Sequence, residues 1–136
     1  GYDADDERNI LMIRRAFESL KPGGRFVLEY MNVPGVLTRL RPERIDRPNL
    51  KELEGLIVLH EPKADLQTGM MLSDWTYLYP DGRRAVQHVE TRLYMPSEIA
   101  GLMKRCGFVE VEMFGSVEKV PLDLDAPRCI VTSRKP

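Results

Sequence analysis

The side chains best suited to chemistry lie in the segment from residue 75 to residue 94. Histidine exchanges a proton readily near neutral pH, so His88 is a candidate general base. Arg92 can bind a carboxylate substrate through two parallel hydrogen bonds. Each has a structural alternative, because a lone strand histidine is often structural and Arg92 can form a cross-strand ion pair. The residue types alone leave both alternatives open.

Trp75 and Tyr77 alternate along an expected strand in the same segment. Aromatic side chains on a strand either pack against a neighbouring layer or offer a flat platform to a ligand. The two rings are therefore candidates for substrate contact, with packing as the competing explanation.

An acidic cluster opens the chain, with Asp3, Asp5, Asp6 and Glu7 in close succession. A calcium loop would place its oxygen ligands at alternating positions and close with a glutamate, and this spacing is absent. Acidic side chains also stabilise the first turn of a helix. The cluster therefore indicates a helix start, and we expect no metal site.

Length and charge narrow the possible partners. The 136 residues suffice for one compact domain, and the formal net charge of -1 leaves no basic surplus for binding nucleic acid through its phosphates. No apolar stretch approaches the roughly 20 residues needed to span a bilayer. Cys106 and Cys129 lack metal-type spacing, and we interpret them as reduced thiols of a cytoplasmic protein.

Hydrophobic periodicity and turn residues predict the elements. A helix capped by Asp5 or Asp6 runs to about Leu20, and a Pro-Gly-Gly turn leads to a strand at 25–31. The strand is almost entirely apolar, which is typical of a parallel sheet covered on both faces. Residues 32–51 are expected to form a loop with a helical turn at 36–40. The later elements are strands at 53–61, 69–79 and 84–94, a helix at 96–106, and strands at 109–114 and 129–133.

Four segments, taken in order, carry a resemblance to a known family. They are Leu20-Lys21-Pro22-Gly23-Gly24-Arg25 with its following strand, the hairpin turn Pro80-Asp81-Gly82, Arg92-Leu93-Tyr94-Met95-Pro96-Ser97-Glu98, and Cys106-Gly107-Phe108 with Phe114-Gly115-Ser116. Together these segments resemble the second half of small-molecule methyltransferases of class I, the Rossmann-like class, which use S-adenosylmethionine. The resemblance covers essentially all 136 residues.

The resemblance implies an α/β fold: a truncated Rossmann-like methyltransferase sheet, formed by its last strands and helices, with an inserted antiparallel β-hairpin region at 53–94. Residues 1–136 would form a single domain, the C-terminal part of a methyltransferase domain, and the insertion would cover the substrate. The chain begins with Gly and lacks the strand that should precede its first helix, so we expect a processed, cloned or truncated piece.

The sequence departs from the family in two places. Met95 stands where a threonine usually opens a capping box, so the reciprocal cap is expected to be lost at a cost of about 1 kcal/mol. The second departure concerns the cofactor, S-adenosylmethionine. No Gly-x-Gly-x-x-Gly occurs in the chain, although the family holds its cofactor on a glycine-rich loop. The chain alone is therefore expected to be inactive.

The resemblance also implies the positions of site residues. Gly1 and Tyr2 would follow the family's fourth strand, beside the cofactor and the methyl-transfer site. Asn32 would lie at the carboxyl end of the sheet, where ligands bind in open α/β folds. The residues expected to contact a small-molecule substrate are Asn32, Trp75, Tyr77, His88, Arg92 and Tyr94. No catalytic residue is assigned, and the methyl acceptor stays open.

The sequence is compatible with three functions. The chain is the substrate-cover half of a methyltransferase, or a non-catalytic interaction module derived from one, or a small antiparallel binding protein of unrelated ancestry. In the first two cases the strand at 25–31 would lack its usual neighbour. Exposed sheet edges tend to pair, so we predict a homodimer through this edge.

Overall fold

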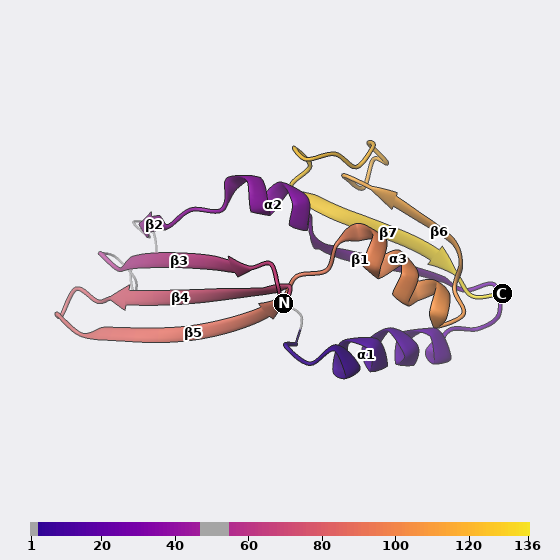
Figure 1. The fold of residues 1–136 in the computed structure, drawn as a ribbon, viewed down its shortest axis with the longest axis horizontal. Helices are drawn as coiled ribbons and strands as arrows, with labels where there is room; N and C mark the ends of the chain where they lie inside the picture. Colours follow the sequence, from indigo (N-terminus) through magenta and orange to yellow (C-terminus); the bar gives the residue numbers. More distant parts are fainter. Residues whose placement is uncertain (1–2, 47–54) are drawn as a thin grey trace. The chain divides into compact units, whose positions relative to one another are not determined.

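The computed structural model describes residues 3–46 and 55–136 (Figure 1). Its internal contacts divide the chain into two units. The first, here called the helix–sheet unit, combines Gly1–Arg39 with Arg92–Pro136, and the second, the strand unit, is Leu40–Thr91. The strand unit thus lies in the sequence between the two parts of the helix–sheet unit. No helix among the described residues is both long and apolar enough to cross a membrane.

The helix–sheet unit contains a three-stranded sheet in the order β1-β7-β6. The central strand β7 is antiparallel to both neighbours, with Arg25 opposite Arg134 and Phe114 opposite Ile130. The element bounds confirm the helices and strands predicted for this unit, with the exception of α2, which lies in a segment predicted as a loop. They are α1 (Asp6–Ser19), β1 (Arg25–Met31), α2 (Val33–Arg39), α3 (Pro96–Arg105), β6 (Val109–Phe114) and β7 (Arg128–Arg134).

Helix α1 begins as the sequence predicts. Asp5 is its N-cap, and Asp5 Oδ1 accepts a 2.8 Å hydrogen bond from the backbone N–H of Glu7. The helix ends before Gly23, whose φ of 75° suits the turn into β1. The acidic cluster therefore serves the helix start.

Helix α3 keeps one half of its capping box. The Glu98 carboxylate accepts a 2.7 Å hydrogen bond from the backbone N–H of Met95, so the predicted loss of the reciprocal cap is only partial. Gly107 follows the last turn with a φ of 101°. Phe108 then folds back into the core, where it stacks on Phe26 at 5.4 Å and meets the edge of Phe17 at 5.0 Å.

The expectation for strand β1 was wrong in two respects. It predicted a parallel sheet covered on both faces, but within the described residues β1 pairs only with β7, and antiparallel. Side chains of α1 and α3 pack with Tyr30 in the core, whereas Val27 on the opposite face is 61% exposed. The apolar run reflects a strand with one covered face and one open face.

The strand unit is a four-stranded sheet in the order β2-β3-β4-β5. Figure 1 shows β3, β4 and β5 running in alternating directions. The hairpin at Pro80-Asp81-Gly82 is confirmed by the 2.9 Å hydrogen bond from Tyr79 N to Arg83 O. The strand bounds are β2 (Glu43–Asp46), β3 (Ile57–Asp65), β4 (Met70–Leu78) and β5 (Arg84–Arg92).

Two sequence expectations need correction here. The segment 32–51 was predicted as a loop, but it contains β2 as well as α2, which begins three residues before the predicted helical turn. The strand predicted at 53–61 is observed at Ile57–Asp65, and residues 53 and 54 lie outside the described part of the chain. Strand β2 is short and mostly charged, so its pairing with β3 and not its own composition makes it a strand.

Candidate functional site

Arg92 connects the starts of two helices. Its Nε lies 3.1 Å from Oδ1 of Asp6, the first residue of α1, and its Nη2 lies 3.1 Å from Oε1 of Glu98 in the first turn of α3. The Arg92 side chain is 15% exposed, so these charge-assisted hydrogen bonds are partly shielded from water. Burial opposes ionisation, but the bond to Glu98 and the charge of Asp6 raise the pKa of Arg92. The acidic partners come from helices and not from a neighbouring strand, as the cross-strand alternative supposed.

Tyr94 completes this arrangement, which we call the Arg92 cluster: Asp6, Arg92, Tyr94 and Glu98. The Tyr94 hydroxyl donates a hydrogen bond to Asp6 Oδ1, and the Arg92 guanidinium lies 4.6 Å from the centre of the Tyr94 ring. The residue is 3% exposed. Burial, and then the bond to Asp6, raises the pKa of Tyr94 to about 12, so the phenol remains a neutral hydrogen-bond donor.

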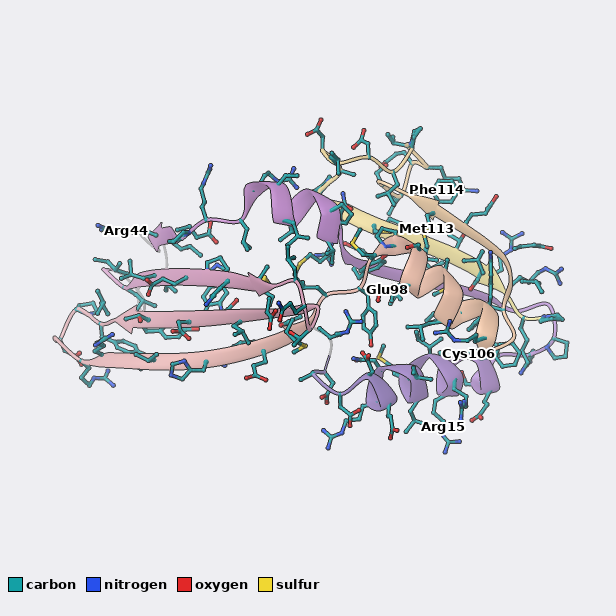
Figure 2. The ribbon with its side chains drawn as sticks, in the orientation of Figure 1. Arg15, Arg44, Glu98, Cys106, Met113 and Phe114 are labelled. Carbon is teal, nitrogen blue, oxygen red and sulfur yellow. The ribbon has the colours of Figure 1, made fainter. Side chains whose placement is uncertain are left out.

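A groove opens beside the Arg92 cluster, with a volume of about 210 Å³. Figure 2 shows Glu98 on the first turn of α3 and Cys106 after its last turn. Both acidic and basic side chains reach the groove, and we call it the charged groove. Its lining includes Asp6, Ile10, Arg92, Tyr94, Glu98 and Arg105.

Asn32 lies directly after β1 and anchors a loop. Its Nδ2 donates to the backbone oxygens of Asp123 and Ala126, at 2.7 and 2.8 Å. The residue is 1% exposed, and its Oδ1 has no hydrogen-bond partner among the described residues. Asn32 is a predicted substrate contact, and its amide nitrogen is thus fully engaged in holding the β6–β7 connection.

Trp75 and Tyr77 share one face of the strand unit with His60. The His60 ring stacks on Trp75 at 3.8 Å with an interplanar angle of 17°. His60 Nδ1 lies 3.1 Å from Glu43 Oε1, and its Nε2 lies 3.2 Å from Ser73 Oγ. We call this set of Glu43, His60, Ser73, Trp75 and Tyr77 the aromatic face.

His88 lies on the opposite face of the same sheet. Its Nδ1 is 2.6 Å from Oδ1 of Asp74, which alternates with Trp75 along β4. The His88 side chain is 75% exposed. The structure therefore brings Trp75 and Tyr77 together and separates His88 from them.

The remaining expectations concern the cofactor and metals. Gly1 and Tyr2, predicted to contact the cofactor, lie outside the described residues. In the described part of the chain, no three His, Cys, Asp or Glu side chains are placed to hold a metal ion.

Sequence reasoning missed His60, Glu43 and Ser73, because only the register of β2, β3 and β4 brings them together. The sequence placed Asp6 at a helix start, and the signal that could have linked Arg92 to the helix starts is its position four residues before α3.

Comparison with solved structures identifies proteins with a similar fold. No protein-family model matches the chain, and no curated protein matches its sequence. Solved structures do match. The CcbJ methyltransferase from Streptomyces caelestis aligns over 95% of this chain and 50% of its own, with a TM-score of 0.75 and 20% identity. An S-adenosylmethionine-dependent methyltransferase from Clostridium acetobutylicum aligns over 96% of this chain and 52% of its own, with a TM-score of 0.74 and 13% identity.

A third match is the sugar N-methyltransferase KedS8 from a Streptoalloteichus species, at a TM-score of 0.67 and 17% identity, over 97% of this chain and 50% of that one. The chain thus spans about half the length of the structures it matches. These matches confirm the predicted resemblance at the level of the fold. The chain has an α/β fold similar to about half of each of these methyltransferase structures.

Proposed function

We propose that this chain is the C-terminal portion of an S-adenosylmethionine-dependent methyltransferase that acts on a small molecule. The observation that carries the proposal is the match to CcbJ over 95% of the chain at a TM-score of 0.75. The Arg92 cluster and the aromatic face add polar and aromatic side chains of the kinds that line small-molecule sites.

The cofactor we propose is S-adenosylmethionine, which supplies the methyl group. The described residues do not fit it by themselves. They contain no glycine-rich loop after a strand, and Gly23 and Gly24 precede β1 instead of following a strand. We therefore propose that the chain is inactive alone.

Each unit has a distinct part in the proposal. The strand unit is the substrate cover, and its aromatic face presents Trp75 and Tyr77 to the acceptor. In the helix–sheet unit, the Arg92 cluster fixes the start of α1, which by resemblance follows the family's fourth strand. Methyl transfer depends largely on alignment of the acceptor and the methyl group in a dry site, so such positioning is a sufficient role.

Both cysteines are free thiols, which supports a cytoplasmic location.

The first test is calorimetric titration of S-adenosylmethionine and S-adenosylhomocysteine into this chain, together with a reading of the gene upstream of the Gly1 codon. No binding at millimolar ligand, with an in-frame glycine-rich loop upstream, is the expected result. The extended protein should then bind both ligands and methylate a small acceptor. An extended protein that carries the loop and binds neither ligand would refute the proposal.

The alternative is a non-catalytic dimerising module derived from a methyltransferase. The feature that favours it is strand β1, which has a neighbour on only one side within the described residues. Both proposals expect a homodimer and no cofactor binding by this chain, so the gene discriminates between them: a start codon directly before Gly1 would support this alternative, and an upstream glycine-rich loop would refute it.

A further inference from the structure

We propose that two copies of this chain pair their β1 strands antiparallel about a two-fold axis at Val27, so that their sheets join into one continuous sheet. The proposal gives the predicted homodimer a definite register, and it does not depend on methyl transfer. Within the described residues β1 pairs with β7 and with no other strand, so its second edge is open. The strand contains no proline or lysine that would oppose pairing at this edge.

The backbone hydrogen bonds to β7 decide which residues of β1 can bond a second copy. The N–H of Lys135 donates a 2.9 Å hydrogen bond to the carbonyl oxygen of Gly24, the residue directly before β1. Backbone groups alternate between the two sides of a strand, so the N–H and C=O groups of Arg25, Val27 and Glu29 face the open edge. A two-fold antiparallel pairing must place these residues opposite one another.

The charges on β1 select one register among those that the backbone allows. Side chains of alternate residues share a face, and Arg25 and Glu29 lie two residues to either side of Val27. A two-fold axis at Val27 therefore places Arg25 of each copy opposite Glu29 of the other, and opposite charges at such positions stabilise a sheet. An axis at Leu28 would also satisfy the backbone, but it would place Glu29 opposite Val27.

The groups needed for these cross-strand ion pairs are available. Arg25 is exposed and forms no hydrogen bond or ion pair with a residue of 3–46 or 55–136, and the nearby Glu110 is already bound by Arg134 at 2.6 Å. Glu29 is 54% exposed and uses Oε1 to bind Arg128 Nε at 2.8 Å, which leaves Oε2 without a partner in the described part of the chain. Each edge thus offers one free guanidinium and one free carboxylate oxygen.

Apolar side chains support the same register on both faces. On the open face, Val27 is 61% exposed and would pack against its own counterpart at the two-fold axis. On the opposite face, Phe26 would lie opposite Leu28 of the second copy. Both of these side chains are partly buried and pack against the core, so the pairing would extend the core from one copy into the next.

A charge exchange tests the register. Sedimentation equilibrium of the 136-residue chain gives the dimer dissociation constant of the wild type, Arg25→Glu, Glu29→Arg and the double variant. Each single variant places like charges opposite one another at two symmetric positions, so it should weaken the dimer about tenfold or more. The double variant restores opposite charges and should return to near the wild-type affinity. Single variants as tight as the wild type, or a double variant as weak as the single ones, would overturn the register, and a monomeric wild type would overturn the dimer.

Two controls exclude other causes. Arg14→Glu makes the same charge change at an exposed position of α1 and should leave the dimer unchanged, so equal weakening there would overturn the proposal. The bond between Glu29 and Arg128 is lost in Glu29→Arg and in the double variant alike, so its loss cannot produce a rescue.

Circular dichroism reports whether each variant is folded, and Arg25→Gln, which removes the attraction without adding repulsion, should weaken the dimer less than Arg25→Glu. Failure of S-adenosylmethionine to bind would not affect these results, so this proposal and the proposed function fail separately.

Discussion

Arg92 Nε and Asp6 Oδ1 lie 3.1 Å apart, although 86 residues separate them in the sequence. All of the strand unit lies in the chain between them. The contact therefore joins the two parts of the helix–sheet unit, Gly1–Arg39 and Arg92–Pro136, between the first residue of α1 and the last residue of β5. It supplements the backbone pairing of β1 with β7, which joins the same two parts at the sheet.

Replacing Arg92 with Gln should destabilise the chain by about 1–3 kcal/mol, because two carboxylates lose their shared guanidinium. This expected loss of stability is smaller than for a fully buried ion pair, because Asp6 and Glu98 are partly solvated. Urea unfolding followed by circular dichroism measures the change. The matched control is Arg8→Gln, whose side chain is 72% exposed in its pair with Asp3 and should cost less than about 0.5 kcal/mol. Equal losses in the two variants would contradict the buried role of Arg92.

Tyr94 should make the chain less stable at high pH. Its pKa is about 12 in the folded state against an ordinary value of 10.0. Below pH 10 both states hold the phenolic proton and the contribution is complete. Between about pH 10 and 12 the unfolded state ionises first, so stability falls as pH rises, by up to about 3 kcal/mol. The measurement is the free energy of unfolding against pH for the wild type and for Tyr94→Phe. The difference in free energy of unfolding between the wild type and Tyr94→Phe should change between about pH 10 and 12, because only the wild type loses stability there. A difference that is independent of pH would contradict the prediction.

Gly107→Ala should cost more than Gly23→Ala, although both glycines have positive φ. A Cβ at Gly107 would lie 2.9 Å from Cζ of Phe17, whereas nothing lies within 4 Å of a Cβ at Gly23. The backbone strain of about 1 kcal/mol is common to both, and overpacking against Phe17 adds about 1–3 kcal/mol at Gly107 alone. Thermal and urea unfolding of the two variants measure the difference. Similar costs would mean that Phe17 moves aside freely.

Local signals predicted most elements of this fold. Helix α1 follows from its acidic cap and periodic apolar residues, and the β4–β5 hairpin follows from Asp81-Gly82. Strand β2 could not be predicted in this way, because a short charged segment becomes a strand only through its register with β3. The open face of β1 was missed for a related reason. An apolar run shows that a strand is buried somewhere, but not which elements cover it.

The same limit applies to the candidate site, where single residues could be predicted but their partners could not. Arg92 and Trp75 were predicted from residue type, but their partners were not. Asp6 and Glu98 reach Arg92 from two helices, and His60 reaches Trp75 from the neighbouring strand. Such pairs depend on long-range packing, which leaves no local pattern in the sequence. The separation of His88 from Trp75 follows from strand alternation once the hairpin register is known.

The two cysteines should react at very different rates with a thiol reagent. Cys129 is fully buried, and burial raises the pKa of its thiol despite an opposing hydrogen bond with Tyr30. Cys106 is only partly buried. In the Cys106→Ser variant, labelling of Cys129 at pH 8 should therefore be slow and should accelerate with low concentrations of urea. The Cys129→Ser variant should label faster. Rapid labelling of Cys129 in the native chain would contradict its place in the core.

The chain should be a homodimer at micromolar concentration, through the edge of β1. Within the described residues β1 has a partner on one side only, and Val27 on this strand is 61% exposed. Unpaired strand edges with apolar side chains tend to pair, whereas a lysine on an edge strand opposes pairing. Light scattering of the wild type should give twice the mass of 15.6 kDa, and Val27→Lys should give the monomer. Val117→Lys is the control, since Val117 is 74% exposed and lies outside the sheet. A monomeric wild type would refute the dimer, and dissociation by Val117→Lys but not by Val27→Lys would place the interface elsewhere.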